Sequence, residues 1–174
     1  MPDTPLGIPY PASTGHTRLW EHLQGMADEL DALLTDIKAD YEGAWGSYTP
    51  VWSGTGASGP SLGNGTITGH YKRVGNTVFV RVVLTLGSTS SAGTGTVYRI
   101  SLPVAAKVGS LLDVFCVGTS GAPYSGNSRI VSASTTGDNM RMAVTDNASV
   151  GNTVPFAWAN GHQLLLHGEY EADA

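Results

Sequence analysis

Five histidines and one cysteine are the side chains with the widest chemistry in this 174-residue chain. The histidines show no HxH, HxxxH or HExxH spacing, the patterns that place two imidazoles on one metal ion. We therefore expect no metal site within one chain. Three copies of His22, or of His70, around a symmetry axis remain an alternative. Cys116 has no second cysteine to pair with and stands among Val114, Phe115 and Val117, which predicts a buried apolar side chain and not a reactive thiolate.

The carboxylates after residue 43 do not form an obvious catalytic pair. A glycoside hydrolase needs two of them roughly 5 to 9 Å apart. The available residues are Asp113, Asp138, Asp146, Glu169, Glu171 and Asp173. The last three crowd one end of the chain, while Asp138 and Asp146 lie in turn-type sequence, where acids usually cap turns. We expect no enzyme activity, no catalytic residue and no cofactor, with glycan depolymerisation as a minor alternative.

Two other catalytic or nucleotide-binding patterns are incomplete. No G-x-S-x-G sequence marks a nucleophile elbow, and serine, histidine and aspartate are too scattered to suggest a triad. The glycine-rich run at residues 54–59 lacks the G-K-[ST] ending of a phosphate loop and is followed by Pro60. A surface loop is the better interpretation.

Charge is sparse and unevenly distributed. Charged residues make up 13% of the chain, and glycine, serine and threonine are abundant, as in extracellular-type β surfaces. Residues 18–42 contain seven acidic and two basic residues, whereas the rest of the chain from Gly43 onward contains six acidic and seven basic ones. The second region lacks the basic stripe that nucleic-acid binding requires. No apolar run approaches the roughly 20 residues of a membrane span, so neither nucleic acid nor membrane insertion is expected.

The first 16 residues predict an extended attachment arm. Four of the nine prolines fall within the first eleven residues, which excludes a helix there. Leu6, Ile8 and Tyr10 are the side chains that would anchor this arm to a larger assembly. A solvated terminus is the alternative. The segment has neither the basic nor the apolar region of an export signal, so we expect synthesis in the cytoplasm without a signal peptide.

Residues 17–42 carry an apolar heptad seam, which predicts a coiled-coil helix. Its a and d positions are the proposed subunit contacts: Leu19, Leu23, Met26, Leu30, Leu33 and Ile37. The e positions are also largely apolar, namely Trp20, Ala27, Leu34 and Tyr41. A stripe of this width favours three helices over two, and so predicts a homotrimer. The alternative is a monomer whose helix packs on its own sheet.

Residues 43–174 change to period-two alternation, which predicts an antiparallel β-sandwich head of jelly-roll type. In residues 78–86 the even-numbered positions are all apolar, so one face of that strand is core and the other is mixed. Gly75-Asn76 predicts a type II′ hairpin and Asn160-Gly161 a type I′ hairpin. The predicted strands are 48–52, 66–74, 77–86, 96–102, 111–118, 129–134, 140–145, 155–159 and 163–170.

A polar loop over residues 121–129 is the proposed receptor-binding element. It carries Tyr124 beside Asn127 and Arg129, the combination of an aromatic face with amide and charged partners that sugar recognition uses. The alternative is a solvated connection with Tyr124 folded onto the sandwich. Trp52, Phe156 and Trp158 fit strand patterns and are predicted to be core or intersubunit residues.

Three segments resemble the C-terminal heads of minor tail and receptor-binding proteins from tailed phages. They are Tyr48-Thr49-Pro50-Val51-Trp52, the run from Leu62 to Val78, and Pro155-Phe156-Ala157-Trp158-Ala159-Asn160-Gly161 with its continuation to Tyr170. The proline-rich arm before a short heptad helix resembles such proteins in phages of actinobacteria. The resemblance implies a homotrimer in the virion tail, or at the tip of a related injection machine, bound to other tail proteins by its N-terminus and to a host cell-surface glycan by its head. A purely structural tail or decoration protein, or a secreted TNF-like or lectin-like module, are the alternatives.

Overall fold

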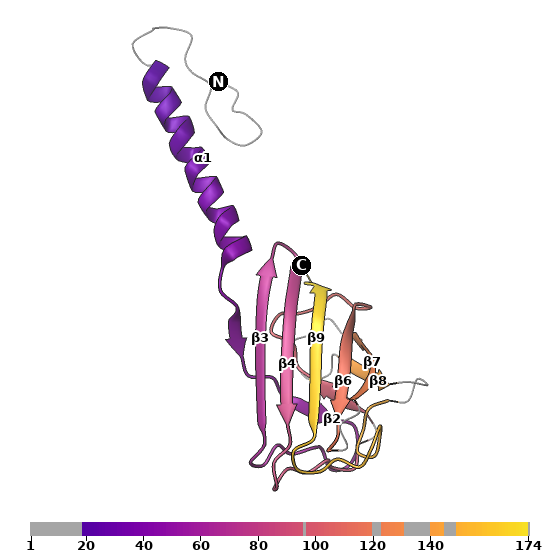
Figure 1. Cartoon of the computed structure of the whole chain (residues 1–174). Helices are drawn as coiled ribbons and strands as arrows, with labels where there is room; N and C mark the ends of the chain where they lie inside the picture. Colours follow the sequence, from indigo (N-terminus) through magenta and orange to yellow (C-terminus); the bar gives the residue numbers. More distant parts are fainter. Residues whose placement is uncertain (1–18, 96, 120–122, 131–139, 145–148, 174) are drawn as a thin grey trace. The chain divides into compact units, whose positions relative to one another are not determined.

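The computed structural model describes residues 19–95, 97–119, 123–130, 140–144 and 149–173 (Figure 1). The chain divides into two compact units, residues 1–43 and residues 44–174. In the first, the expected helix is confirmed as α1 (Leu19–Glu42). The amide of Gly43 donates a last hydrogen bond of 2.8 Å to the carbonyl of Ala39. A Cβ at Gly43 would collide with that carbonyl oxygen, so glycine suits the point where the helix ends.

The apolar side of α1 is exposed from Leu23 to Tyr41, within the part of the helix whose side chains are described. Leu23, Leu30 and Ile37 at the a positions are 57%, 53% and 54% exposed, and Met26 and Leu33 at the d positions are also exposed. Leu19 is the first residue of the helix. The helix therefore presents an apolar seam to its surroundings.

The second unit is built from nine described strands, paired antiparallel throughout. Seven form one sheet in the order β1-β3-β4-β9-β6-β7-β8, and two form a small sheet, β2-β5. A mainly antiparallel β fold with one N-terminal helix is thus confirmed. The strands are β1 (Gly46–Tyr48), β2 (Trp52–Gly54), β3 (Thr66–Val74), β4 (Thr77–Thr85), β5 (Tyr98–Ile100), β6 (Leu111–Val117), β7 (Pro123–Ile130), β8 (Met140–Val144) and β9 (Gln163–Glu171).

The hydrophobic core lies on one face of the large sheet. All four even-numbered residues of β4, from Val78 to Leu84, are buried, as the alternation predicts. Leu164 and Leu166 of β9 and Val114 and Cys116 of β6 continue this face, and Trp52, Tyr98 and Ile100 of the small sheet belong to the same core cluster. The opposite face, which we call the outer face, carries the odd-numbered residues of β4, β6 and β9.

The large sheet has two ends, which we call the turn end, where β3 turns into β4, and the loop end, opposite to it. At the turn end, Gly75 and Asn76 form the expected two-residue hairpin between β3 and β4, with Gly75 at a φ of 57°. The chain enters β1 from this end, because β1 runs antiparallel to β3 with Gly46 opposite Tyr71. At the loop end β3, β9 and β7 begin while β4 and β6 end.

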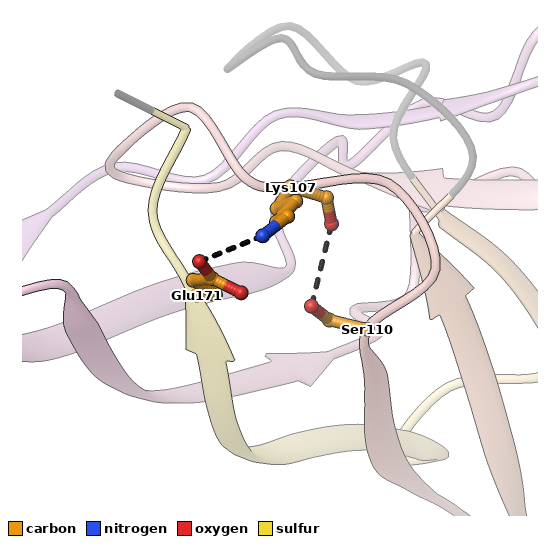
Figure 2. Close-up of polar contacts among 3 residues, drawn as sticks. All are labelled: Lys107, Ser110 and Glu171. Carbon is orange, nitrogen blue, oxygen red and sulfur yellow. Dashed lines mark hydrogen bonds and ion pairs between the residues drawn. The ribbon is translucent and has the colours of Figure 1, made fainter.

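The last strand is fastened at the turn end by one basic residue (Figure 2). The Lys107 amide donates to the Glu171 carbonyl at 2.8 Å, and its ammonium lies 2.9 Å from the Glu171 carboxylate. The Ser110 hydroxyl donates to the Lys107 carbonyl at 3.3 Å. The hydrogen bond to Glu171 raises the pKa of Lys107. The backbone hydrogen bond and the ion pair connect the segment between β5 and β6 to the end of β9.

Three strand predictions are wrong in detail. The strand predicted at 48–52 is two strands, because the chain leaves the large sheet at Pro50 and Val51 exchanges hydrogen bonds with Ser101 instead. Residues 155–159 form no strand, although the Asn160-Gly161 turn exists, closed by His162 N–H donating to the Ala159 carbonyl at 3.1 Å. The strand predicted at 129–134 begins instead at Pro123, as β7, and residues 131–134 lie outside the described part.

Two leucines that are neighbours on β9 test which face is the core. Leu166 is fully buried, so Leu166→Ala should lower the free energy of unfolding by about 2–5 kcal/mol. Leu165 lies on the outer face and is only half-buried, so Leu165→Ala should lower it by about 1 kcal/mol. Urea unfolding measures both, and equal losses would contradict the assignment of the two faces.

Candidate functional site

An aromatic cluster lies at the loop end of the large sheet. The ring of Phe156 is its centre, with ring centroids 5.6 Å from Tyr124, 5.0 Å from Trp158 and 4.8 Å from His162. Tyr124 is 44% exposed, Phe156 and Trp158 are partly buried, and His162 is 7% exposed. The four rings therefore extend from the surface, at Tyr124, to the core, at His162.

The register of the sheet positions Tyr124. It lies directly opposite Cys116, whose side chain is fully buried, so Tyr124 is on the core face of β7 but close to the strand's beginning. There the core is no longer covered, and Phe156 supports the tyrosine ring from the loop that precedes β9. One side of the ring is packed and the rest faces solvent.

Hydrogen bonds hold the loop that carries Phe156. The Trp158 indole N–H donates to the Gly151 carbonyl at 2.7 Å. The Ala159 amide donates to His162 Nδ1 at 3.1 Å, which places the imidazole proton of the neutral ring on Nε2. Trp158 and His162 therefore serve to fix this loop, and Phe156 is wedged between them.

Further aromatic rings extend the cluster into the core. Tyr98 lies 5.9 Å from Trp158 and 5.1 Å from Trp52, between ring centroids. The Tyr98 hydroxyl donates to the Ala92 carbonyl at 2.7 Å, and burial raises the pKa of this phenol. The buried Trp52 indole N–H has no hydrogen-bond partner in the described part of the chain. The prediction that Trp52 is a core residue is confirmed.

The described segments that follow or precede the strands at the loop end contain no lysine, arginine, aspartate or glutamate. This holds for residues 54–68, 83–95, 115–119, 123–128 and 149–165. Hydroxyls and amides replace ions there: Asn64 Oδ1 accepts from the Thr89 amide at 2.9 Å, and Asn64 Nδ2 donates to the Ser88 hydroxyl at 3.1 Å. Two of these segments are joined by backbone hydrogen bonds between Leu86 and the turn at Gly161 and His162, and between Gly95 and Asn152, so the described surface beside the aromatic cluster is uncharged.

The outer face of the sheet is chemically different. His70, Arg81, His167, Asp113 and Asn127 occupy one row across β3, β4, β9, β6 and β7. The imidazole of His167 lies 3.7 Å from the Asp113 carboxylate and 5.5 Å, between ring centroids, from Phe115. Both side chains are more than half exposed, so their contact adds little stability.

The structure separates the three residues predicted to bind a receptor. The predicted loop over 121–129 is wrong from Pro123 onward, because that stretch is strand β7. Asn127 and Arg129, opposite Asp113 and Leu111, lie on the outer face, whereas Tyr124 lies on the other face. Phe156 and Trp158 pack against the core as predicted, but the sequence does not reveal that Phe156 meets Tyr124.

Several other predicted residues remain without a structural test. Leu6, Ile8, Tyr10, Asp138 and Asp146 lie outside the described residues. Among the residues that the structure describes, no three histidine, cysteine, aspartate or glutamate side chains gather as a metal site. This observation concerns one chain and does not test His22 or His70 around a symmetry axis.

Replacing Phe156 with alanine should destabilise the fold more than replacing Tyr124. Phe156→Ala should lower the free energy of unfolding by about 2 kcal/mol, because it leaves a gap between Tyr124, Trp158 and His162. Tyr124→Ala, at an exposed position, should lower it by less than about 1 kcal/mol. Urea unfolding followed by tryptophan emission measures both. A larger loss for Tyr124→Ala would show that its ring is a structural part of the core.

The buried thiol gives a pH-dependent signal. Burial raises the pKa of Cys116 from 9.0 to about 12. The folded chain holds this proton more tightly than the unfolded chain, so the resulting stability is complete below pH 9 and is lost as the pH rises toward 12. Between about pH 8 and about pH 10 the wild type should lose about 1 kcal/mol more than Cys116→Ala, in which the buried tyrosines are unchanged. Parallel pH profiles would contradict the burial of the thiol.

No described helix of this chain is both long and apolar enough to span a membrane. In comparisons with known proteins, no family model, no curated protein and no solved structure matches the chain.

Proposed function

We propose that this chain is a homotrimeric attachment protein of the phage-tail type. In this proposal α1 joins three copies as a coiled coil, and the β unit is an unequal β-sandwich head that binds a host cell-surface glycan. Residues 1–16 attach the trimer to other tail proteins, an assignment that rests on their sequence. The protein is not an enzyme in this view, and its place is the virion tail.

One observation carries the proposal: the apolar seam of α1 is exposed. A fully buried leucine contributes about 1.5–3 kcal/mol relative to an exposed one, so a helix with five exposed seam side chains has much to gain from a partner. The same heptad positions in a second and third copy supply a matching surface without any further component.

The e positions favour three helices. Leu34 and Tyr41 are exposed on the flank of the seam, which makes the apolar stripe wider than two helices cover. So few heptads give a marginal coil on their own. We therefore assign part of the trimer's stability to contacts between the β units.

Binding is favoured over a purely structural role by the aromatic cluster. Tyr124 remains exposed although Phe156, Trp158 and His162 form a packed support beside it. An exposed ring that is held in place is a common element of ligand-binding surfaces.

The native mass in solution tests the proposal. The wild type should have three times the chain mass of 18.1 kDa, or about 54 kDa, by light scattering. Leu30→Lys, which puts a charge into the seam, should give monomers with a folded β unit. Asp31→Lys is the matched control, since position 31 is the outward b position and should preserve the trimer.

A wild-type mass near 18 kDa at micromolar concentration would contradict the proposal. A mass twice that of one chain would retain the seam as an interface but contradict the trimer. Added salt should strengthen the trimer, because α1 carries seven acidic residues and one lysine.

A further inference from the structure

We propose that the aromatic cluster at the loop end is a binding site for the pyranose rings of an uncharged glycan, with Tyr124 as the stacking surface. The inference rests on the proposed function only in treating the β unit as the binding part. It goes beyond it by naming the site and the chemical class of the sugar.

The first argument is the way Tyr124 is held. The centroid of its ring lies 5.6 Å from the centroid of the Phe156 ring. Phe156 in turn packs between Trp158 and His162, and each of these two side chains forms a hydrogen bond with the backbone of the same loop region. The rings that support Tyr124 are therefore already ordered before a ligand binds, which lowers the entropy cost of binding. A sugar ring can stack its C–H face on the exposed side of this tyrosine.

The second argument is the distribution of charge. The five segments around the cluster hold no lysine, arginine, aspartate or glutamate, while Lys72, Arg73, Lys107, Glu169 and Glu171 lie toward the turn end. Phosphate- or carboxylate-bearing polymers are normally held by arginine or lysine. Their absence from the described loop end favours a neutral ligand.

The third argument is the supply of hydrogen-bonding groups that carry no charge. Thr119 follows β6 next to the start of β7, Thr153 lies in the turn whose Gly151 carbonyl accepts from Trp158, and Asn160 lies in the turn before His162. All three are exposed. Hydroxyls and amides of this kind match the hydroxyls of a sugar.

The outer face is the rival location. Asn127 and Arg129 lie on the same face as Asp113 and His167. The outer face therefore suits a charged ligand better than a neutral one. The experiment below tests whether the outer face takes part in binding.

The experiment uses the full chain and an array of immobilised glycans. The neutral probes are mannosides, galactosides and N-acetylglucosaminides, and the anionic probes are glucuronate and glycerol-phosphate polymers. We expect binding to at least one neutral probe, and added salt between about 0.05 and about 0.5 M NaCl should not weaken it. Tyr124→Ala should weaken it at least about tenfold, Tyr124→Phe should retain it, and Arg129→Ala, the outer-face control, should leave it unchanged.

Binding of anionic probes alone, lost in salt, would overturn the inference, as would loss through Arg129→Ala but not through Tyr124→Ala. A trimer that adsorbs to cells but ignores every neutral probe would also overturn it, while the proposed function would stand. Conversely, a monomeric wild type with weak, Tyr124-dependent binding of a neutral sugar would support this site and contradict the trimer.

Discussion

The register of β4 between β3 and β9 fixes which side chains of these three central strands face the core. Each neighbour pairs with β4 along its full length, so a slip of one residue would exchange the buried Val82 with the outer-face Val83. In the neighbouring pairings, His167 lies opposite Asp113 between β9 and β6, and Tyr124 lies opposite Cys116 between β6 and β7. The outer-face row from His70 to Asn127 and the aromatic cluster therefore lie on opposite faces of one sheet.

In the described part of the loop end, hydrogen bonds between uncharged groups connect the loops. Asn64 is bonded to Thr89 and Ser88, and Ser58 exchanges hydrogen bonds with Thr94 across two loops. Glycine makes these approaches possible: Gly63 has a φ of 54°, and a Cβ there would collide with the Thr89 carbonyl. Because these polar groups are largely satisfied by one another, the loops remain uncharged yet ordered beside the aromatic rings.

Alternation made the long strands predictable, and tertiary context decided the rest. β3, β4 and β9 follow clear period-two patterns that end at turn residues such as Gly75. β7 was not predictable, because Ser125, Gly126 and Asn127 have low strand propensity and become a strand only between β6 and β8. The contact of Tyr124 with Phe156 joins residues far apart in sequence, so it follows from the register and not from any local motif.

The proposed trimer helix would compensate for weak sugar binding by a single aromatic cluster. A neutral sugar gains nothing from long-range electrostatic steering, and each stacking contact contributes modestly, so one head alone would bind weakly. In the proposed trimer, linking three heads would turn later contacts into intramolecular ones and multiply the affinity. The seven acids of α1 would oppose this association by about a few tenths of a kcal/mol for each like-charged surface pair, whereas burying one seam leucine would return about 1.5–3 kcal/mol. Apolar burial would therefore outweigh repulsion along the seam, and the proposed uncharged binding surface would gain most from being carried by such a trimer.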